Sequence, residues 1–215
     1  MEKMNSKSDR RNFIKTSAAI TTGLLGLSGL NQFVEAKNVS SADDLYKIGP
    51  MEGYSPHIGT LVSMLNYNRQ TIIQTVQSLT MAQLDHLHDP TANTIAALVF
   101  HLGATDKYYQ ISTFEGRQEF NEAEKKIWDV PMNLGEEGRK KIKGQEVKYY
   151  LDIISEVRQK TLEEFKKKDD NWLLSNGRSP NTYWKWFHVC EHESNHRGQM
   201  TWLKSRLPGA GSSRD

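Results

Sequence analysis

The chain has 215 residues, a quarter of them charged, and a formal net charge of +2. Residues 1–36 hold five of the 28 basic and three of the 26 acidic residues, so the other 179 residues hold 23 of each sign. A formally neutral chain of this length suits one domain with a packed core and does not favour nucleic acid as a partner. The single cysteine, Cys190, excludes a framework of internal disulfides.

Residues 1–36 have the pattern of an export signal. A basic start contains the pair Arg10 and Arg11, an uncharged stretch follows over 16–34, and small residues lead up to Ala36. Paired arginines in this setting are typical of the twin-arginine signal, whose route carries proteins that are already folded. We expect cleavage after Ala36 and a periplasmic or otherwise extracytoplasmic protein. The alternative is an uncleaved membrane anchor, which the Gly and Thr content of the stretch disfavours.

Four later segments have the apolar spacing of amphipathic helices, with apolar residues recurring at three and four positions. They span residues 56–79, 93–116, 145–168 and 184–207. The stretch 117–144 is charged and interrupted by Pro131 and glycines, which predicts a crossover or a flap over one end of the fold. We therefore expect an all-α fold over 37–207, an antiparallel four-helix bundle with one long crossover between the second and third helices. Residues 208–215 are expected to be a disordered tail.

The last predicted helix carries three histidines at intervals of four, His188, His192 and His196. A helix turns about 100° per residue, so the three imidazoles lie on one stripe. Four further residues share that sector and predict that it is buried: Val189, Gln199, Leu203 and Leu207. Two imidazoles one turn apart commonly bind a divalent metal on a helix. The alternative for each is a hydrogen-bonded core histidine, and His188 is expected to be either that or a group that supports a ligand histidine or faces the substrate.

The opposite side of this helix is expected to hold polar residues and the only thiol. Its members are Cys190, Ser194, Arg197 and Thr201. The position of Cys190 argues against a role as metal ligand. Arg197 is expected to tie neighbouring helices or a subunit interface together.

The letters from His192 to His196 also satisfy H-E-x-x-H, the zinc peptidase motif, in which Glu193 would activate the metal-bound water. No glutamate follows Glu193, and no glycine and histidine follow His196 at the spacing of the elongated motif. A third ligand must therefore come from upstream, and His101, on the inward face of the second predicted helix, supplies it. Glu193 is interpreted as a general base or an orienting group, with an exposed helix glutamate as the alternative.

Residues 94–109, TIAALVFHLGATDKYY, followed much later by H-x-x-x-H-R-G-Q, resemble the DinB-like (YfiT-like) superfamily. The resemblance covers nearly all of the chain after the signal. It implies a four-helix bundle, often dimeric, that holds a nickel or zinc ion with three histidines, here His101, His192 and His196. Activities known in that superfamily include thiol-dependent S-transferases and a maleylpyruvate isomerase.

Three neutral histidines on a divalent ion leave at least one coordination position open. We therefore expect an exported, metal-dependent hydrolase or transferase that acts on a small molecule. The alternative is a non-catalytic metal-binding bundle for storage, sensing or assembly. A pocket beside the open position would favour the enzyme, whereas a closed site with His188 or Glu193 as fourth ligand would favour the alternative.

Overall fold

The computed structural model describes residues 44–175 and 180–210, and the expected export signal lies outside these ranges. Within them the chain is helical and contains no strand, which confirms the all-α class. The elements in order are a 3-10 helix η2 (Asp44–Tyr46), α2 (Pro56–Val76), α3 (Met81–Leu84), α4 (Ile95–Thr113), α5 (Glu122–Asn133), α6 (Gly135–Lys141), α7 (Val147–Phe165), α8 (Asp170–Leu174) and α9 (Thr182–Lys204). None of these helices is long and apolar enough to cross a membrane.

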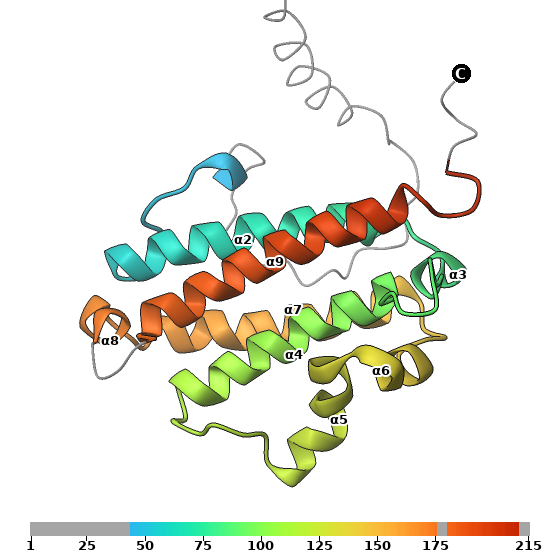
Figure 1. The fold of residues 1–215 in the computed structure, drawn as a ribbon. Coiled ribbons are helices and arrows are strands. Elements are labelled where there is room, and N and C mark those ends of the chain that lie inside the picture. Colours follow the sequence, from blue (N-terminus) through green and yellow to red (C-terminus); the bar gives the residue numbers. More distant parts are fainter. Residues whose placement is uncertain (1–43, 176–179, 211–215) are drawn as a thin grey trace, which may run out of the picture. The chain divides into compact units, whose positions relative to one another are not determined.

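Four long helices form the body of the fold (Figure 1). Helix α9 packs along α2 and also contacts α4, while α4 packs along α7. The apolar stripe expected for the first long helix is the face that α2 buries, from Ile58 and Leu61 through to Val76. Burial of this kind, rather than helix propensity, supplies most of the stability of such helices.

The ends of the long helices follow the expected segments closely. Thr94 is the N-cap of α4, and its hydroxyl accepts a hydrogen bond from the amide of Ala97 at 3.1 Å. The start of α2 is capped differently, by a residue that is distant in sequence. Asp170 of α8 accepts hydrogen bonds from the amides of His57 and Ile58, so α8 fixes the beginning of α2.

The stretch 117–144 is not a plain connection, because it contains helices α5 and α6. Asn121 and Glu124 form a reciprocal capping box at the start of α5. At its other end Leu134 has φ 55° and ψ −133°, a conformation that L-residues rarely adopt, and the chain turns there into α6. Helix α5 packs against α4 through Trp128, whose side chain is buried with Ala104.

The centre of the fold contains a buried cluster of four charged side chains, one from each long helix. They are Arg69 of α2, Asp106 of α4, Arg158 of α7 and Glu193 of α9. Asp106 Oδ2 accepts from Arg158 Nε at 2.7 Å, and Glu193 Oε1 accepts from Arg158 Nη2 at 2.8 Å and from Arg69 Nη2 at 2.5 Å. The two positive charges balance the two negative charges. In addition, Arg69 Nη1 donates to the carbonyl of Ile154, and Arg158 Nη1 donates to the carbonyl of Leu65. We name this set the charged cluster.

The buried face of α9 differs from the expected one. Cys190 and Glu193 are buried, at 6% and 1% exposure, while Gln199 is exposed. Cys190 lies on the side of α9 away from the histidines and is not among the residues that could hold a metal, but that side is buried where Glu193 meets the two arginines. Arg197 does tie helices together, because its Nη1 donates to Thr71 Oγ1 of α2 at 2.7 Å.

Near the C-terminus, residues 208–210 make a turn in which the amide of Ala210 donates to the carbonyl of Leu207. Ala210 packs against the apolar core. The structure therefore describes the start of the expected tail as ordered chain, and residues 211–215 lie outside the described ranges.

Candidate metal centre

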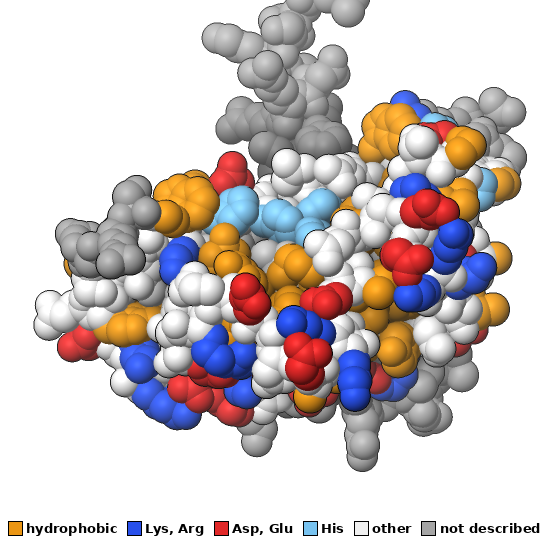
Figure 2. Space-filling view, turned by 60° about the horizontal axis from the view of Figure 1, so that its bottom comes forward, with side chains coloured by type: hydrophobic (Ala, Val, Ile, Leu, Met, Phe, Trp, Pro, Cys, Tyr) orange, Lys and Arg blue, Asp and Glu red, His pale blue; other side chains and the backbone are white. Residues whose placement is uncertain are grey.

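Three histidines from two helices converge on one point. His101 of α4 and His192 and His196 of α9 place one ring nitrogen each within 4.8 Å of the others. The Nε2 of His192 lies 3.2 Å from the Nε2 of His101 and 3.1 Å from that of His196. All three side chains are half-buried, and Figure 2 shows histidine side chains in a contiguous row on the surface, flanked by hydrophobic groups.

The second nitrogen of two of these rings is fixed by an acceptor. His101 Nδ1 donates to the carbonyl of Pro131 at 2.8 Å. That carbonyl lies near the end of α5, where the turn at Leu134 interrupts the helical pairing that would otherwise use it. His196 Nδ1 donates to Gln199 Oε1 at 2.9 Å, one turn further along α9. Both bonds leave Nε2 as the nitrogen with a free lone pair.

This arrangement suits a cation better than it suits three imidazoles alone. With His101 and His196 protonated on Nδ1, only His192 could place a proton between the Nε2 atoms, and one proton can serve only one of the two short contacts. A divalent metal accepts all three lone pairs at once. The residues present therefore fit the metal that the histidine spacing predicts.

Burial also keeps these imidazoles neutral, the form that binds metal. It lowers the pKa of His192 to about 3, helped by the neighbouring histidines. Burial lowers the pKa of His101 and His196 as well, against the opposing effect of the bonds to Pro131 and Gln199. The cluster is therefore ready to bind a cation at neutral pH without first losing protons.

His188 lies next to the cluster but outside it. Its ring stacks on Trp184 at 5.1 Å between centroids and lies 5.6 Å from the ring of His192. Its Nδ1 faces Glu191 Oε2 at 3.5 Å. His188 therefore extends the row of histidines along α9 without facing the point where the other three meet.

Glu193 is placed differently from its two histidine neighbours. It is buried, so the alternative of an exposed helix glutamate was wrong. Its Oε1 is occupied by Arg69 and Arg158, while Oε2 is buried and has no partner. Because Oε1 is engaged by two guanidiniums and the side chain is 1% exposed, this geometry gives little support to a general base or to the peptidase motif. The role that the contacts show is structural.

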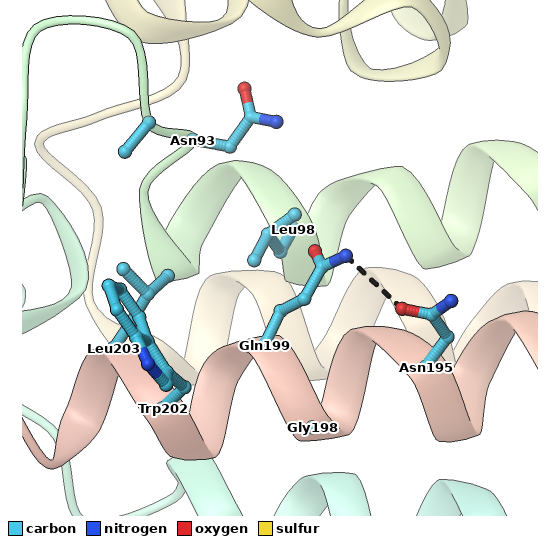
Figure 3. A pocket seen from close by; sticks show the side chains of 8 residues that line it. Asn93, Leu98, Asn195, Gly198, Gln199, Trp202 and Leu203 are labelled. Carbon is cyan, nitrogen blue, oxygen red and sulfur yellow. Dashed lines mark hydrogen bonds between the residues drawn. The ribbon is translucent and has the colours of Figure 1, made fainter.

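A hollow of about 470 Å³ lies between the start of α4 and the second half of α9, and its lining includes neighbours of the ligand histidines but none of the three themselves. Its walls include Leu98, one turn before His101, and Gln199, one turn after His196. Figure 3 shows Gln199 reaching from α9 toward Leu98, with Asn93 across from them and Trp202 one turn along. Gln199 therefore belongs both to the hollow and to the support of His196.

Sequence reasoning missed both groups that hold the ligand histidines. Gln199 could have been found, because it follows His196 by three residues, a spacing that brings side chains together on a helix. The Pro131 carbonyl carries no side-chain signal. This carbonyl is free to accept from His101 because α5 ends nearby, and the charged, proline-interrupted sequence of 117–144 did not predict that helix.

The described part of the chain is all-helical, and three histidines from two of its helices meet at a point where a metal ion could bind. The sequence model of the mycothiol-S-transferase family matches residues 60–209, well over half of the chain. The chain therefore belongs to this family, which is of the DinB/YfiT-like type. No curated protein matches the chain.

Proposed function

We propose that this protein is a metal-dependent transferase that joins a low-molecular-weight thiol to a small electrophile, with a nickel or zinc ion held by His101, His192 and His196. The convergence of three Nε2 lone pairs beside an open hollow is the observation that carries the proposal. Membership of the mycothiol-S-transferase family supports the choice of a thiol. Bound there, the ion would lower the pKa of a coordinated thiol or water.

The protein's own groups position the reactants. Pro131 and Gln199 hold two ligand histidines in the tautomer that presents Nε2. In the reaction the thiol sulfur would form a bond to an electrophilic carbon while the bond from that carbon to the leaving group breaks, the leaving group taking the electron pair and the thiol proton passing to solvent or to the leaving group. A hydrolase that uses bound water at the same site is the second form of this proposal.

A non-catalytic metal-binding bundle is the competing function. It would be favoured by a closed site in which His188 or Glu193 filled the remaining position. Among the described residues, the group able to hold a metal contains neither of them. Glu193 is engaged by arginines and His188 faces Glu191, so the geometry favours an open position and hence the enzyme.

Three further expectations belong to this proposal. The frame is the antiparallel four-helix bundle with one long crossover, and the protein works as a homodimer. The twin-arginine signal in residues 1–36 exports it, folded and with metal bound, to the periplasm. No membrane anchor remains after cleavage, and the partner is a small molecule rather than nucleic acid.

The test begins with elemental analysis of the full chain beside a His192→Ala/His196→Ala variant. We expect about one equivalent of nickel or zinc in the parent and none in the variant. The loaded protein is then assayed for conjugation of small thiols to monochlorobimane. Metal without conjugation or hydrolysis would favour the storage or sensing function. No metal in either protein, after purification without chelators and reconstitution, would sink the metalloenzyme proposal.

A further inference from the structure

We infer that Leu134 is a positioning residue for the metal centre: its unusual backbone conformation keeps the carbonyl of Pro131 available to His101. The inference rests on the metal-binding part of the proposed function. Leu134 lies in the turn between α5 and α6 (Figure 1). It acts through the orientation of one ligand imidazole rather than by touching metal or substrate.

The first observation is the way α5 is attached to α4. Near the start of α5, Glu124 Oε1 lies 2.9 Å from Lys107 Nζ, and in its middle the buried ring of Trp128 packs against α4. Near its end the carbonyl of Pro131 accepts from His101 Nδ1 at 2.8 Å. The contacts run in opposite directions along the two helices, so the last turn of α5 arrives at the ligand histidine.

The second observation is that α5 must end at this point for its carbonyl to be available. In a continuous α-helix the carbonyl of Pro131 would accept from the amide of Gly135, four residues on. Leu134, with φ 55° and ψ −133°, and Gly135, with φ 64°, leave the helical path. Burial lowers the pKa of His101, and hydrogen bonding to the backbone of Pro131 and Met132 opposes this effect. Two consecutive residues at the end of α5 therefore face the imidazole.

The third observation is the choice of residue at the turn. Leu134 is the one non-glycine residue with positive φ in the part of the chain that the structure describes, whereas turns such as those at Gly116 and Gly144 use glycine. An L-residue in this region is strained, and it stays there only where its surroundings impose the conformation. The side chain of Leu134 packs against the apolar core. We therefore assign to that packing the role of holding the turn that frees the carbonyl.

The alternative is a plain connector between α5 and α6. A connector needs only to make the turn, so a change at Leu134 would alter stability, and any loss of metal affinity would follow the loss of stability. Positioning predicts that the two quantities separate. Metal affinity should depend on the backbone conformation of Leu134, whereas stability depends also on its side chain.

The test compares Leu134→Gly with Leu134→Val in the full chain. Glycine adopts positive φ without strain but loses the packing of the side chain. Leu134→Gly should therefore lower the urea midpoint of the metal-free protein, while its zinc affinity, measured by competition with a chelator, stays within about threefold of the parent.

Valine keeps an apolar side chain, but a β-branched residue is a true outlier at positive φ. In Leu134→Val the chain should leave this conformation, the carbonyl should turn away from His101, and zinc affinity should fall by about 10- to 100-fold. The matched control is Leu162→Val, the same change at a half-buried leucine within α7. It should leave zinc affinity unchanged.

The tautomer of His101 is a second readout that needs no metal. In ¹⁵N NMR of the histidine side chains at neutral pH, metal-free parent and Leu134→Gly should carry the proton of His101 on Nδ1. In Leu134→Val the proton should be found on Nε2 or shared between the two nitrogens. His101→Asn assigns the signal.

Equal loss of zinc affinity in Leu134→Gly and Leu134→Val, or unchanged affinity in Leu134→Val, would overturn the positioning role. So would a proton on His101 Nδ1 in all three proteins, or on Nε2 in the parent. Failure of the proposed function would look different. A parent that binds no metal, with a tautomer that still changes in Leu134→Val, would uphold the positioning of His101 and reject the metal.

Discussion

Two polar groups of side chains lie next to each other on α9, and they are built in opposite ways. The charged cluster takes one residue from each long helix, is fully buried, and balances two guanidiniums against two carboxylates. The histidine cluster takes residues from two helices, is half-buried, and turns three acceptors toward one point. The charges of the first cluster balance among its own side chains. The second cluster presents three nitrogen lone pairs that a bound cation would satisfy. On the proposed function His192 and Glu193, neighbours in sequence, therefore serve different purposes: His192 binds the metal and Glu193 holds the helices together.

Removing a ligand histidine should have the largest effect. His192→Ala takes away the nitrogen that lies nearest to both others, so metal affinity should fall by at least about a hundredfold while the metal-free fold persists. Competition with a chelator of known affinity measures this. His188→Ala, one turn earlier on the same helix, is the control and should keep about one equivalent of metal. An equal loss in both variants would show that the row of histidines, rather than the three, forms the site.

Breaking the charged cluster should act on stability instead. Glu193→Gln leaves two buried guanidiniums with one carboxylate, and removal of one partner from a buried pair costs about 3–5 kcal/mol. Urea unfolding of the metal-free protein measures the change, and Glu191→Gln, exposed on the same helix, is the control. Unchanged stability together with lost turnover would contradict the structural role and restore Glu193 as a catalytic candidate.

Gln199 should have an intermediate effect, confined to the histidine cluster. Gln199→Leu removes the acceptor of His196 Nδ1 while preserving the side-chain volume, and loss of such a supporting group weakens metal affinity by about 10- to 100-fold. One equivalent should still bind at saturating metal. Gln199→Glu, which keeps an acceptor, should restore most of the affinity. If Gln199→Leu binds metal as tightly as the parent, the hydrogen bond to His196 does not support the site.

The smallest effect should come from pH. Burial lowers the pKa of the three histidines, that of His192 from 6.5 to about 3. Between these values the unfolded chain binds protons that the folded chain does not, so stability is greatest above pH 6.5 and decreases as the pH falls. Urea unfolding of metal-free protein from pH 7.5 to 4.5 should show this decline, and His192→Asn should reduce it. A decline of equal size in the variant would assign it to other groups.

The sequence predicted the parts of this fold that depend on apolar periodicity. The expected segments match α2, α4, α7 and α9 to within a few residues at each end, because their buried faces repeat at helical spacing. The three histidines that converge were also the three expected. Helix α5 was not predicted, although Asn121 and Glu124 have the spacing of a capping box at its start. Pro131 and the surrounding charged residues are more typical of a connection between helices.

The charged cluster could not be predicted in the same way. Arg69 and Arg158 look like the other charged residues of their helices, and only the packing of four helices brings them to Asp106 and Glu193. The burial of Glu193 and Cys190 depends on that packing, so it could not be predicted from the pattern along α9 alone.

The hydrogen bond from His101 to the carbonyl of Pro131 constrains the length of the chain that leads up to this carbonyl. Surface connections generally tolerate insertions and deletions, and 117–144 has the charged composition of such a stretch. Yet one residue added or deleted within α5 ahead of Pro131 would turn the rest of that helix by about 100° and carry the carbonyl away from His101. Variation in length among related chains should therefore fall outside the stretch from Glu122 to Pro131. A natural variant with a changed spacing ahead of Pro131 would need another acceptor for that imidazole.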